Sequence, residues 1–133
     1  MADPLIVSQV VWEDAGCTLL ARLLGHAAAA VTQVSLTGLK IWWYDLSSTT
    51  PETELNTSGT SLDKTAVIFD TLQTDDRWDV DDTGFNFAYA VTPATTILTA
   101  EHLYRAVVWF DPATGADFPA VFDLRAQSVL RGL

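Results

Sequence analysis

A single cysteine, Cys17, is present among the 133 residues of this sequence. It cannot form a disulfide within the chain, so the disulfide-rich scaffolds of small secreted domains are excluded. A chain of this length buries roughly two thirds of its unfolded surface, which is enough for one hydrophobic core without a disulfide or a metal. Because Cys17 precedes Leu19 and Leu20, we expect a buried thiol rather than a reactive nucleophile.

Basic residues are also few, with seven Lys and Arg against 17 Asp and Glu and a net charge of −10. They are scattered and cannot neutralise a row of phosphates, so we expect no binding to nucleic acid or to an anionic membrane. The longest apolar region, 19–31, is interrupted by Arg22 and His26 and is too short to cross about 30 Å of hydrocarbon. The start of the chain lacks the positive stretch of a secretory signal, which predicts synthesis in a cytoplasm. Such acidity favours solubility or docking on a basic protein surface.

Sequence signatures of catalysis are absent. The chain has no Gly-x-Ser-x-Gly elbow, no phosphate-binding glycine loop and no dinucleotide fingerprint. His26 and His102 stand in no spacing typical of a metal site or a catalytic triad. A glycosidase can use any two carboxylates, so composition alone does not exclude one. We nevertheless expect no enzyme and no cofactor.

What the sequence does contain is regular alternation of apolar residues in its C-terminal third. A period of two places successive side chains on opposite faces of a sheet. The stretches 85–91, 104–110 and 118–127 alternate in this way, and a turn at 111–115 separates the last two. The residues predicted to face inward are Phe85, Phe87, Tyr89 and Val91; Tyr104, Ala106, Val108 and Phe110; and Phe118, Ala120, Phe122, Leu124 and Ala126.

Further short strands are predicted upstream. Cys17–Leu24, Leu39–Leu46 and Ala66–Phe69 are rich in apolar, β-branched or aromatic residues. Between the last two, Ser47–Thr65 is rich in Ser and Thr and predicts a long polar loop. Seven or eight short strands without strand–helix–strand alternation predict an all-β fold, an antiparallel β-sandwich formed by a single domain over residues 16–133.

Residues 1–15 fit two interpretations. Leu5–Val7 and Val10–Trp12 are apolar, and Pro4 disfavours a helix. The segment is either an extended N-terminal arm that adds a strand to a neighbouring protein, or the first strand of the domain. The sequence favours the two equally.

An acidic stretch at 75–84 is the densest cluster of ionisable residues. Oxygen ligands at alternate positions are typical of calcium loops, but an EF-hand that began at Asp79 would need its bidentate Glu where Ala90 stands. We therefore predict a turn whose Asp side chains cap backbone N–H groups, with an ion pair to Arg77. A divalent ion is the less favoured alternative, with candidate ligands Asp79, Asp81 and Asp82.

Five tryptophans are present, and two of them are neighbours. Trp42 and Trp43 must face opposite sides of their strand, so we expect one in the core and the other at the surface or in an interface. Trp109 lies on the face opposite Tyr104 and Phe110, so its strand can be covered on both sides. A platform for stacking sugars is the alternative function for these rings.

Several segments, in this order, carry a resemblance to a known family. They are Leu36-Thr37-Gly38 before the Trp/Tyr strand, the Ser/Thr-rich loop, Val67–Asp75, Asp82–Phe87 and Tyr104–Val108. Together they resemble small immunoglobulin-like accessory proteins of tailed bacteriophage virions, over most of residues 16–129. The resemblance implies a non-enzymatic immunoglobulin-like β-sandwich that docks on a virion surface. It also implies a homo-oligomer, often a trimer when such a protein decorates a capsid.

We accordingly expect a capsid decoration (cement) protein that binds and stabilises neighbouring major capsid subunits in a virion assembled in the host cytoplasm. The alternatives are a tail or baseplate adaptor and a carbohydrate-binding module for host surface glycans. The Ser47–Thr65 loop is a second candidate surface. The predicted contact residues are Leu5, Ile6, Val7, Val10, Val11 and Trp12, with one of Trp42 and Trp43.

Overall fold

The computed structural model describes residues 5–12, 16–25, 29–56, 58–91 and 99–128, without the side chain of Leu5. Residues 1–4 and 13–15 of the N-terminal segment, and His26, lie outside these ranges. The described elements are eight strands and one short helix. They are β1 (Leu5–Trp12), β2 (Cys17–Ala21), β3 (Leu36–Asp45), β4 (Thr60–Leu62), α1 (Lys64–Val67), β5 (Ile68–Gln73), β6 (Phe85–Val91), β7 (Leu103–Pro112) and β8 (Phe118–Gln127).

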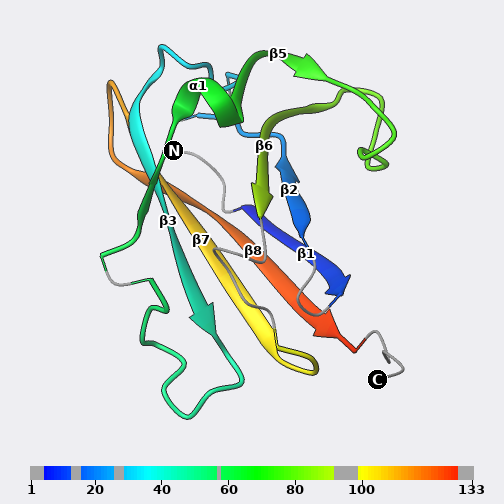
Figure 1. Ribbon diagram of the computed structural model, residues 1–133. Coiled ribbons are helices and arrows are strands. Elements are labelled where there is room, and N and C mark those ends of the chain that lie inside the picture. Colours follow the sequence, from blue (N-terminus) through cyan, green and yellow to red (C-terminus); the bar gives the residue numbers. More distant parts are fainter. Residues whose placement is uncertain (1–4, 13–15, 26–28, 57, 92–98, 129–133) are drawn as a thin grey trace.

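The strands form two sheets, so the predicted all-β sandwich is confirmed (Figure 1). The larger sheet has the order β1-β8-β7-β3-β4, and the smaller has the order β2-β6-β5. Every pair is antiparallel except β1 and β8, which run parallel. Parallel partners cannot be joined by a hairpin, and here nearly the whole chain lies between them. Among the described residues, no helix is long and apolar enough to span a membrane.

The N-terminal segment joins the larger sheet. Leu5–Trp12 pairs with β8 over all eight of its residues, from Leu5 opposite Ala120 to Trp12 opposite Gln127. The structure therefore agrees with the second interpretation of this segment, the first strand of the domain. β1 is an edge strand of the sandwich and does not extend away from it as an arm.

The core lies between the sheets and follows the predicted alternation. Phe87 of the smaller sheet packs against Phe110 and Phe122 of the larger one, with ring centroids 5.9 and 5.7 Å apart. Among the residues predicted to face inward, only Tyr89 is half-buried, and the others are buried. Cys17 is half-buried against this core, and burial raises the pKa of its thiol, as expected for an unreactive cysteine.

Asn86 departs from the alternation. The period of two places it on the outward face of its strand, yet it is buried between Phe85 and Phe87. Its side-chain amide donates to the carbonyl oxygens of Leu23 and Val31, at 3.0 and 3.1 Å. Backbone from the β2–β3 connection therefore covers this face of β6. Asn86 supplies hydrogen-bond donors to backbone carbonyls that this covering segment buries.

The predicted loop and strand between 47 and 69 are partly wrong. The loop ends earlier, because β4 pairs with β3 and α1 begins at Lys64. The predicted strand Ala66–Phe69 starts as the last residues of α1 and becomes β5 only at Ile68. A capping residue explains the helical turn, since the Asp63 carboxylate accepts a hydrogen bond from the Thr65 N–H at 2.9 Å.

Candidate docking face

An apolar row crosses the outer face of the larger sheet. Ile6 of β1 lies opposite Val121 of β8, Val121 lies opposite Val107 of β7, and Val107 lies opposite Trp42 of β3. Residues that are directly opposite in a sheet point to the same side. Ile6 is 63% exposed, and the other three are half-buried. Side chains from four strands thus form one continuous apolar strip.

A second row lies beside the first. Pro119 of β8 is opposite Trp109 of β7, and Trp109 is opposite Lys40 of β3. The Trp109 side chain is 42% exposed, so the prediction that its strand is covered on both sides is not met within the described residues. We call the two rows together the outer apolar face, which consists of Ile6, Trp42, Val107, Trp109, Pro119 and Val121.

A polar row borders this face on its other side. Arg105 of β7 and Asp123 of β8 are directly opposite and form a two-point ion pair, with N–O distances of 2.8 and 3.1 Å. The hydrogen bonds to Asp123 raise the pKa of the Arg105 guanidinium. Because the two charges are matched within the sheet, this row needs no charged group from a partner.

The predicted contact residues of the N-terminal segment divide by the pleat of β1. Ile6, Val10 and Trp12 point outward and are 63, 60 and 56% exposed. Val11 is buried and Val7 packs against the core, so neither side chain belongs to the outer apolar face. Alternation along the strand assigns them to the inner face.

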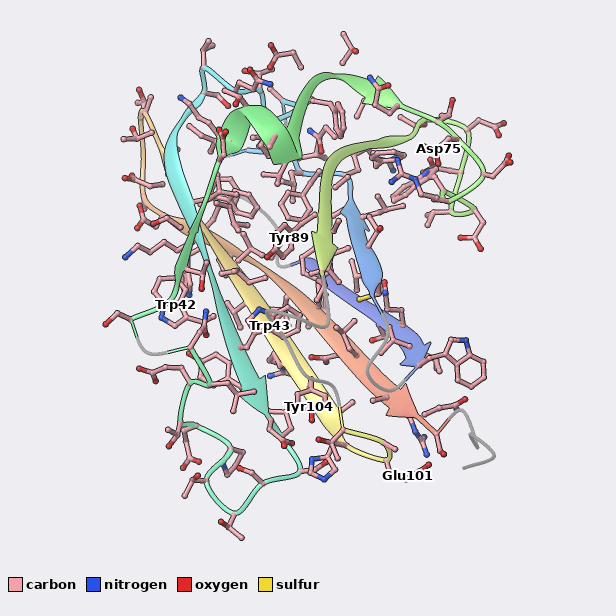
Figure 2. The ribbon with its side chains drawn as sticks, viewed as in Figure 1. Trp42, Trp43, Asp75, Tyr89, Glu101 and Tyr104 are labelled. Atoms are coloured by element: carbon pink, nitrogen blue, oxygen red, sulfur yellow. The ribbon has the colours of Figure 1, made fainter. Side chains whose placement is uncertain are left out.

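The tryptophan pair is divided in the predicted way (Figure 2). Trp43 is in the core, and Trp42 is half-buried on the outer face. The backbone of Gly59 packs on the indole of Trp42, where an added Cβ would lie 2.6 Å from Cε2. The ammonium of Lys40 lies 5.9 Å from the same ring. The loop after β3 therefore holds the Trp42 side chain in place. The same loop is hydrogen-bonded to β3 through Asn56, whose side chain accepts from the Trp43 N–H and donates to the Ile41 carbonyl.

A shallow groove of about 350 Å³ opens beside Trp42 and Trp109. Its floor includes Gly38, where an added Cβ would meet nothing within 4 Å. Asp111 and Asp117 also line the groove, as does Lys40, which lies directly opposite Trp109 in the sheet. The groove combines one exposed flat ring with carboxylates, which is a surface that a sugar can contact.

The acidic turn is stabilised by its own hydrogen bonds. One oxygen of Asp81 accepts from the indole N–H of Trp78 and from the N–H groups of Thr83 and Gly84, at 3.0–3.1 Å. Its other oxygen pairs with Arg22 at 2.7 Å. The hydrogen bond from the Gly84 N–H has the largest effect on the pKa of Asp81, and together these bonds hold that pKa well below its ordinary value. The predicted Asp-capped turn is confirmed, and so is the ion pair of Arg77, which is with Asp75 at 2.8 Å.

The candidate metal ligands do not converge. No group of three or more His, Cys, Asp or Glu that could hold a metal ion exists in the part of the chain that the structure describes. Asp81 is engaged by four partners, and Asp79 and Asp82 are not brought to it as a ligand set. The turn instead uses the Asp81 carboxylate to cap backbone N–H groups.

A His–Asp pair was missed by sequence reasoning. His102 Nδ1 lies 2.7 Å from Asp45 Oδ2, and the ring of His102 stacks on Tyr104. The Ser47 hydroxyl accepts a hydrogen bond from the Leu103 N–H. These contacts connect the end of β3 to the start of β7. The two residues are 57 apart in the sequence, and no local pattern links them.

Comparisons with known proteins add no relative, since no protein-family model and no curated protein matches the chain.

Proposed function

We propose that this protein is a virion structural protein of a tailed bacteriophage, a capsid decoration protein that binds the major capsid protein through its outer apolar face. The observation that supports it best is the continuous apolar strip across β1, β8, β7 and β3 on a domain with a net charge of −10. Contiguous apolar surface of this kind is typical of a protein interface. The working part of the molecule is then a surface, and no chemistry is required of it.

The strand order supports the immunoglobulin-like part of this proposal. In variable-type immunoglobulin sandwiches, strands G, F, C and C′ are neighbours in one sheet, and strands B, E and D are neighbours in the other. Here β8, β7, β3 and β4 correspond to G, F, C and C′ and are neighbours in the larger sheet. In the same way, β2, β6 and β5 correspond to B, E and D and form the smaller sheet. The corresponding strands follow one another in the same order along the chain. The parallel strand β1 extends the larger sheet beyond β8.

Two side chains support it further. Trp43, on the strand that corresponds to C, is buried, as is typical of that strand. Tyr104, near the start of β7, accepts a hydrogen bond at its hydroxyl from the Thr99 N–H at 2.8 Å, which is the geometry of a tyrosine corner. Ala106 stands two residues later, where antibody domains have a disulfide cysteine. The strand order, Trp43 and Tyr104 are therefore compatible with a variable-type immunoglobulin sandwich that lacks the disulfide.

Binding through such a face is weak for one copy. Covering about 300 Å² of apolar surface contributes roughly 7 kcal/mol at about 25 cal/mol per Å². Lost translational and rotational freedom offsets much of that gain. A homo-oligomer that engages several capsid subunits at once would bind far more tightly. The acidic charge adds attraction to a basic capsid surface, and salt weakens that attraction.

The test is co-sedimentation with shells assembled from the major capsid protein of the phage that carries this gene. Ile6→Arg and Trp109→Arg place a charge in the outer apolar face, and we expect each to lower shell affinity at least tenfold. Val80→Arg is the matched control, since Val80 is 68% exposed in the acidic turn, outside this face. Wild-type affinity in both face variants would overturn the proposal. Binding to tail or baseplate proteins in place of shells would support the adaptor alternative.

The groove beside Trp109 favours one other function, binding of a host surface glycan. An exposed indole flanked by Asp111 and Asp117 can stack on a pyranose and accept hydrogen bonds from its hydroxyls. Titration of the protein with host glycans, followed by tryptophan fluorescence, tests it. A saturable change in the wild type that is lost in Trp109→Ala would support this function over docking.

A further inference from the structure

The edge strand β1 offers an unpaired backbone. One side of β1 binds β8, and no strand among the described residues pairs with its other side (Figure 1). An edge of this kind presents N–H and C=O groups to any strand that can lie against it.

This edge has none of the features that usually block such pairing. The eight residues of β1, LIVSQVVW, include no charge, no proline and no glycine. Natural edge strands are commonly protected by charges, prolines, bulges or shortness. At the opposite edge of the same sheet, β4 is only three residues long. In the smaller sheet, β5 carries Asp70 and pairs irregularly with β6. The fourth edge, β2, is five residues long, so β1 is the longest of the four edge strands and carries no charge.

We propose that β1 pairs antiparallel with β1 of a second copy, about a two-fold axis through Gln9. In this register Ile6 lies opposite Trp12 of the second copy, and Val7 lies opposite Val11 of the second copy. Gln9 meets its own equivalent. The inward positions Val7, Gln9 and Val11 then have like partners, and Ile6 and Trp12, near the two ends of β1, form aliphatic–aromatic cross-strand pairs.

Neighbouring registers are poorer. Centring the axis on Ser8 leaves Trp12 without a partner on β1 and places Gln9 opposite Val7. Centring it on Val10 leaves Ile6 without a partner and again places Gln9 opposite an apolar side chain. A shift by one residue would bring outward residues of one copy opposite inward residues of the other. The pattern of β1 thus selects the Gln9 register.

The axis runs perpendicular to the sheet, so the outer faces of both copies lie on the same side. Ten strands become continuous, and the apolar row of each copy continues through Ile6 to Trp12 of the second copy. The interface is isologous, as two-fold dimers require. The pairing does not depend on what binds the outer apolar face.

The dimer is expected to be of modest affinity. One pair of strands and three exposed side chains per copy bury less than the roughly 1,200–2,000 Å² of a standard interface, and each copy carries a charge of −10. For so small an interface we expect a dissociation constant on the order of 10–100 µM, and added salt should lower it by screening the repulsion. This geometry yields a dimer, whereas the phage resemblance implies a trimer, so the mass in solution distinguishes them.

The first measurement is sedimentation equilibrium of the full chain from about 1 to 300 µM. The expected mass rises from 14.5 kDa toward twice that value. Val10→Lys introduces an edge charge and should keep the chain monomeric, whereas Val80→Lys, with the same added charge elsewhere, should dimerise like the wild type. A monomer over the whole range, or a mass three times that of one chain, would overturn the pairing.

The second measurement fixes the register by cysteine cross-linking in a Cys17→Ser background. Gln9→Cys places two thiols at the axis, at a cross-strand spacing that a disulfide accepts. Ser8→Cys is the control, because Ser8 lies opposite Val10 of the second copy and not opposite itself. Under mild oxidation, Gln9→Cys should form covalent dimers at least tenfold faster than Ser8→Cys. Equal rates, or a faster Ser8→Cys, would contradict the proposed register.

Discussion

The side chain of Asn86 is bound from both sides by the backbone of Leu23. The Leu23 N–H donates to Asn86 Oδ1 at 2.6 Å, and the Leu23 carbonyl accepts from Asn86 Nδ2 at 3.0 Å. Asn86 is the one buried polar residue among those described, and it connects the central strand of the smaller sheet to the chain leaving β2. This contact makes the position intolerant of any residue without both a donor and an acceptor.

Asn86→Ala should lower the free energy of unfolding by about 2–4 kcal/mol, because it leaves backbone groups of Leu23 and Val31 buried without partners. Asn86→Asp should cost more at pH 7, since a buried carboxylate faces two carbonyl oxygens, and less at pH 4, where the carboxyl can be neutral. Urea denaturation at both pH values measures the effect. Equal losses for Asn86→Asp at pH 4 and pH 7 would contradict this account.

Tyr104→Phe should cost about 1–2 kcal/mol, because the Thr99 N–H loses its acceptor. Tyr89→Phe is the matched control, since the Tyr89 hydroxyl makes no hydrogen bond with the described residues, and its stability should stay within about 0.5 kcal/mol of the wild type. Chemical denaturation of the two variants side by side decides the point. A loss in Tyr89→Phe as large as in Tyr104→Phe would remove the special role of Tyr104.

Gly59→Ala should destabilise the protein by about 1–3 kcal/mol. Gly59 has φ +74°, and an added Cβ would lie 2.6 Å from the Trp42 ring, so both backbone strain and a clash oppose alanine. Gly38→Ala is the control, because it adds a methyl group where nothing lies within 4 Å. Urea unfolding of the two variants, followed by circular dichroism, measures their stability. Unchanged stability in Gly59→Ala would show that Gly59 does not hold Trp42 in place.

Asp81 should make the stability of the folded protein sensitive to acid. Its pKa is depressed below the ordinary value of 3.8 in the folded protein, so its contribution to stability is present above that value and disappears as the pH falls through the depressed pKa. Asp81→Asn should therefore lower the melting temperature at pH 7, and the gap from the wild type should narrow below about pH 4. Asp79→Asn, a change of another exposed carboxyl in the same turn, is the control. A gap that stays constant down to pH 2 would exclude this role.

The core could be predicted from the sequence because its signal is local. Phe87, Phe110 and Phe122 each belong to a strand with a clear period of two, and neighbouring residues alone place them inside. Trp42 and Trp43 follow the same rule, since adjacent residues on a strand must separate. The same reasoning failed for Asn86, whose burial depends on backbone 55 and 63 residues away.

The outer apolar face could be predicted only in part. Of its residues, the sequence predicts Ile6 and one tryptophan of the Trp42–Trp43 pair as contacts, but nothing in Leu5–Trp12 indicates that its partner is the last strand of the chain. Val107 and Val121 join Ile6 and Trp42 only through the register of four strands. Alternation along a strand predicts which face of the sheet each side chain occupies. Which side chains lie next to one another across strands depends on the strand order and register, and these are not visible in any local stretch of sequence.

Footprinting of surface side chains by a carbene reagent, with the protein free and bound to capsid shells, tests the central claim most directly. The account predicts that Ile6, Trp109 and Val121 lose most of their labelling on binding, while Val34 and Val80, which are exposed outside the outer apolar face, keep theirs. Unchanged labelling of Ile6 and Trp109 in the bound protein, with protection elsewhere, would contradict it.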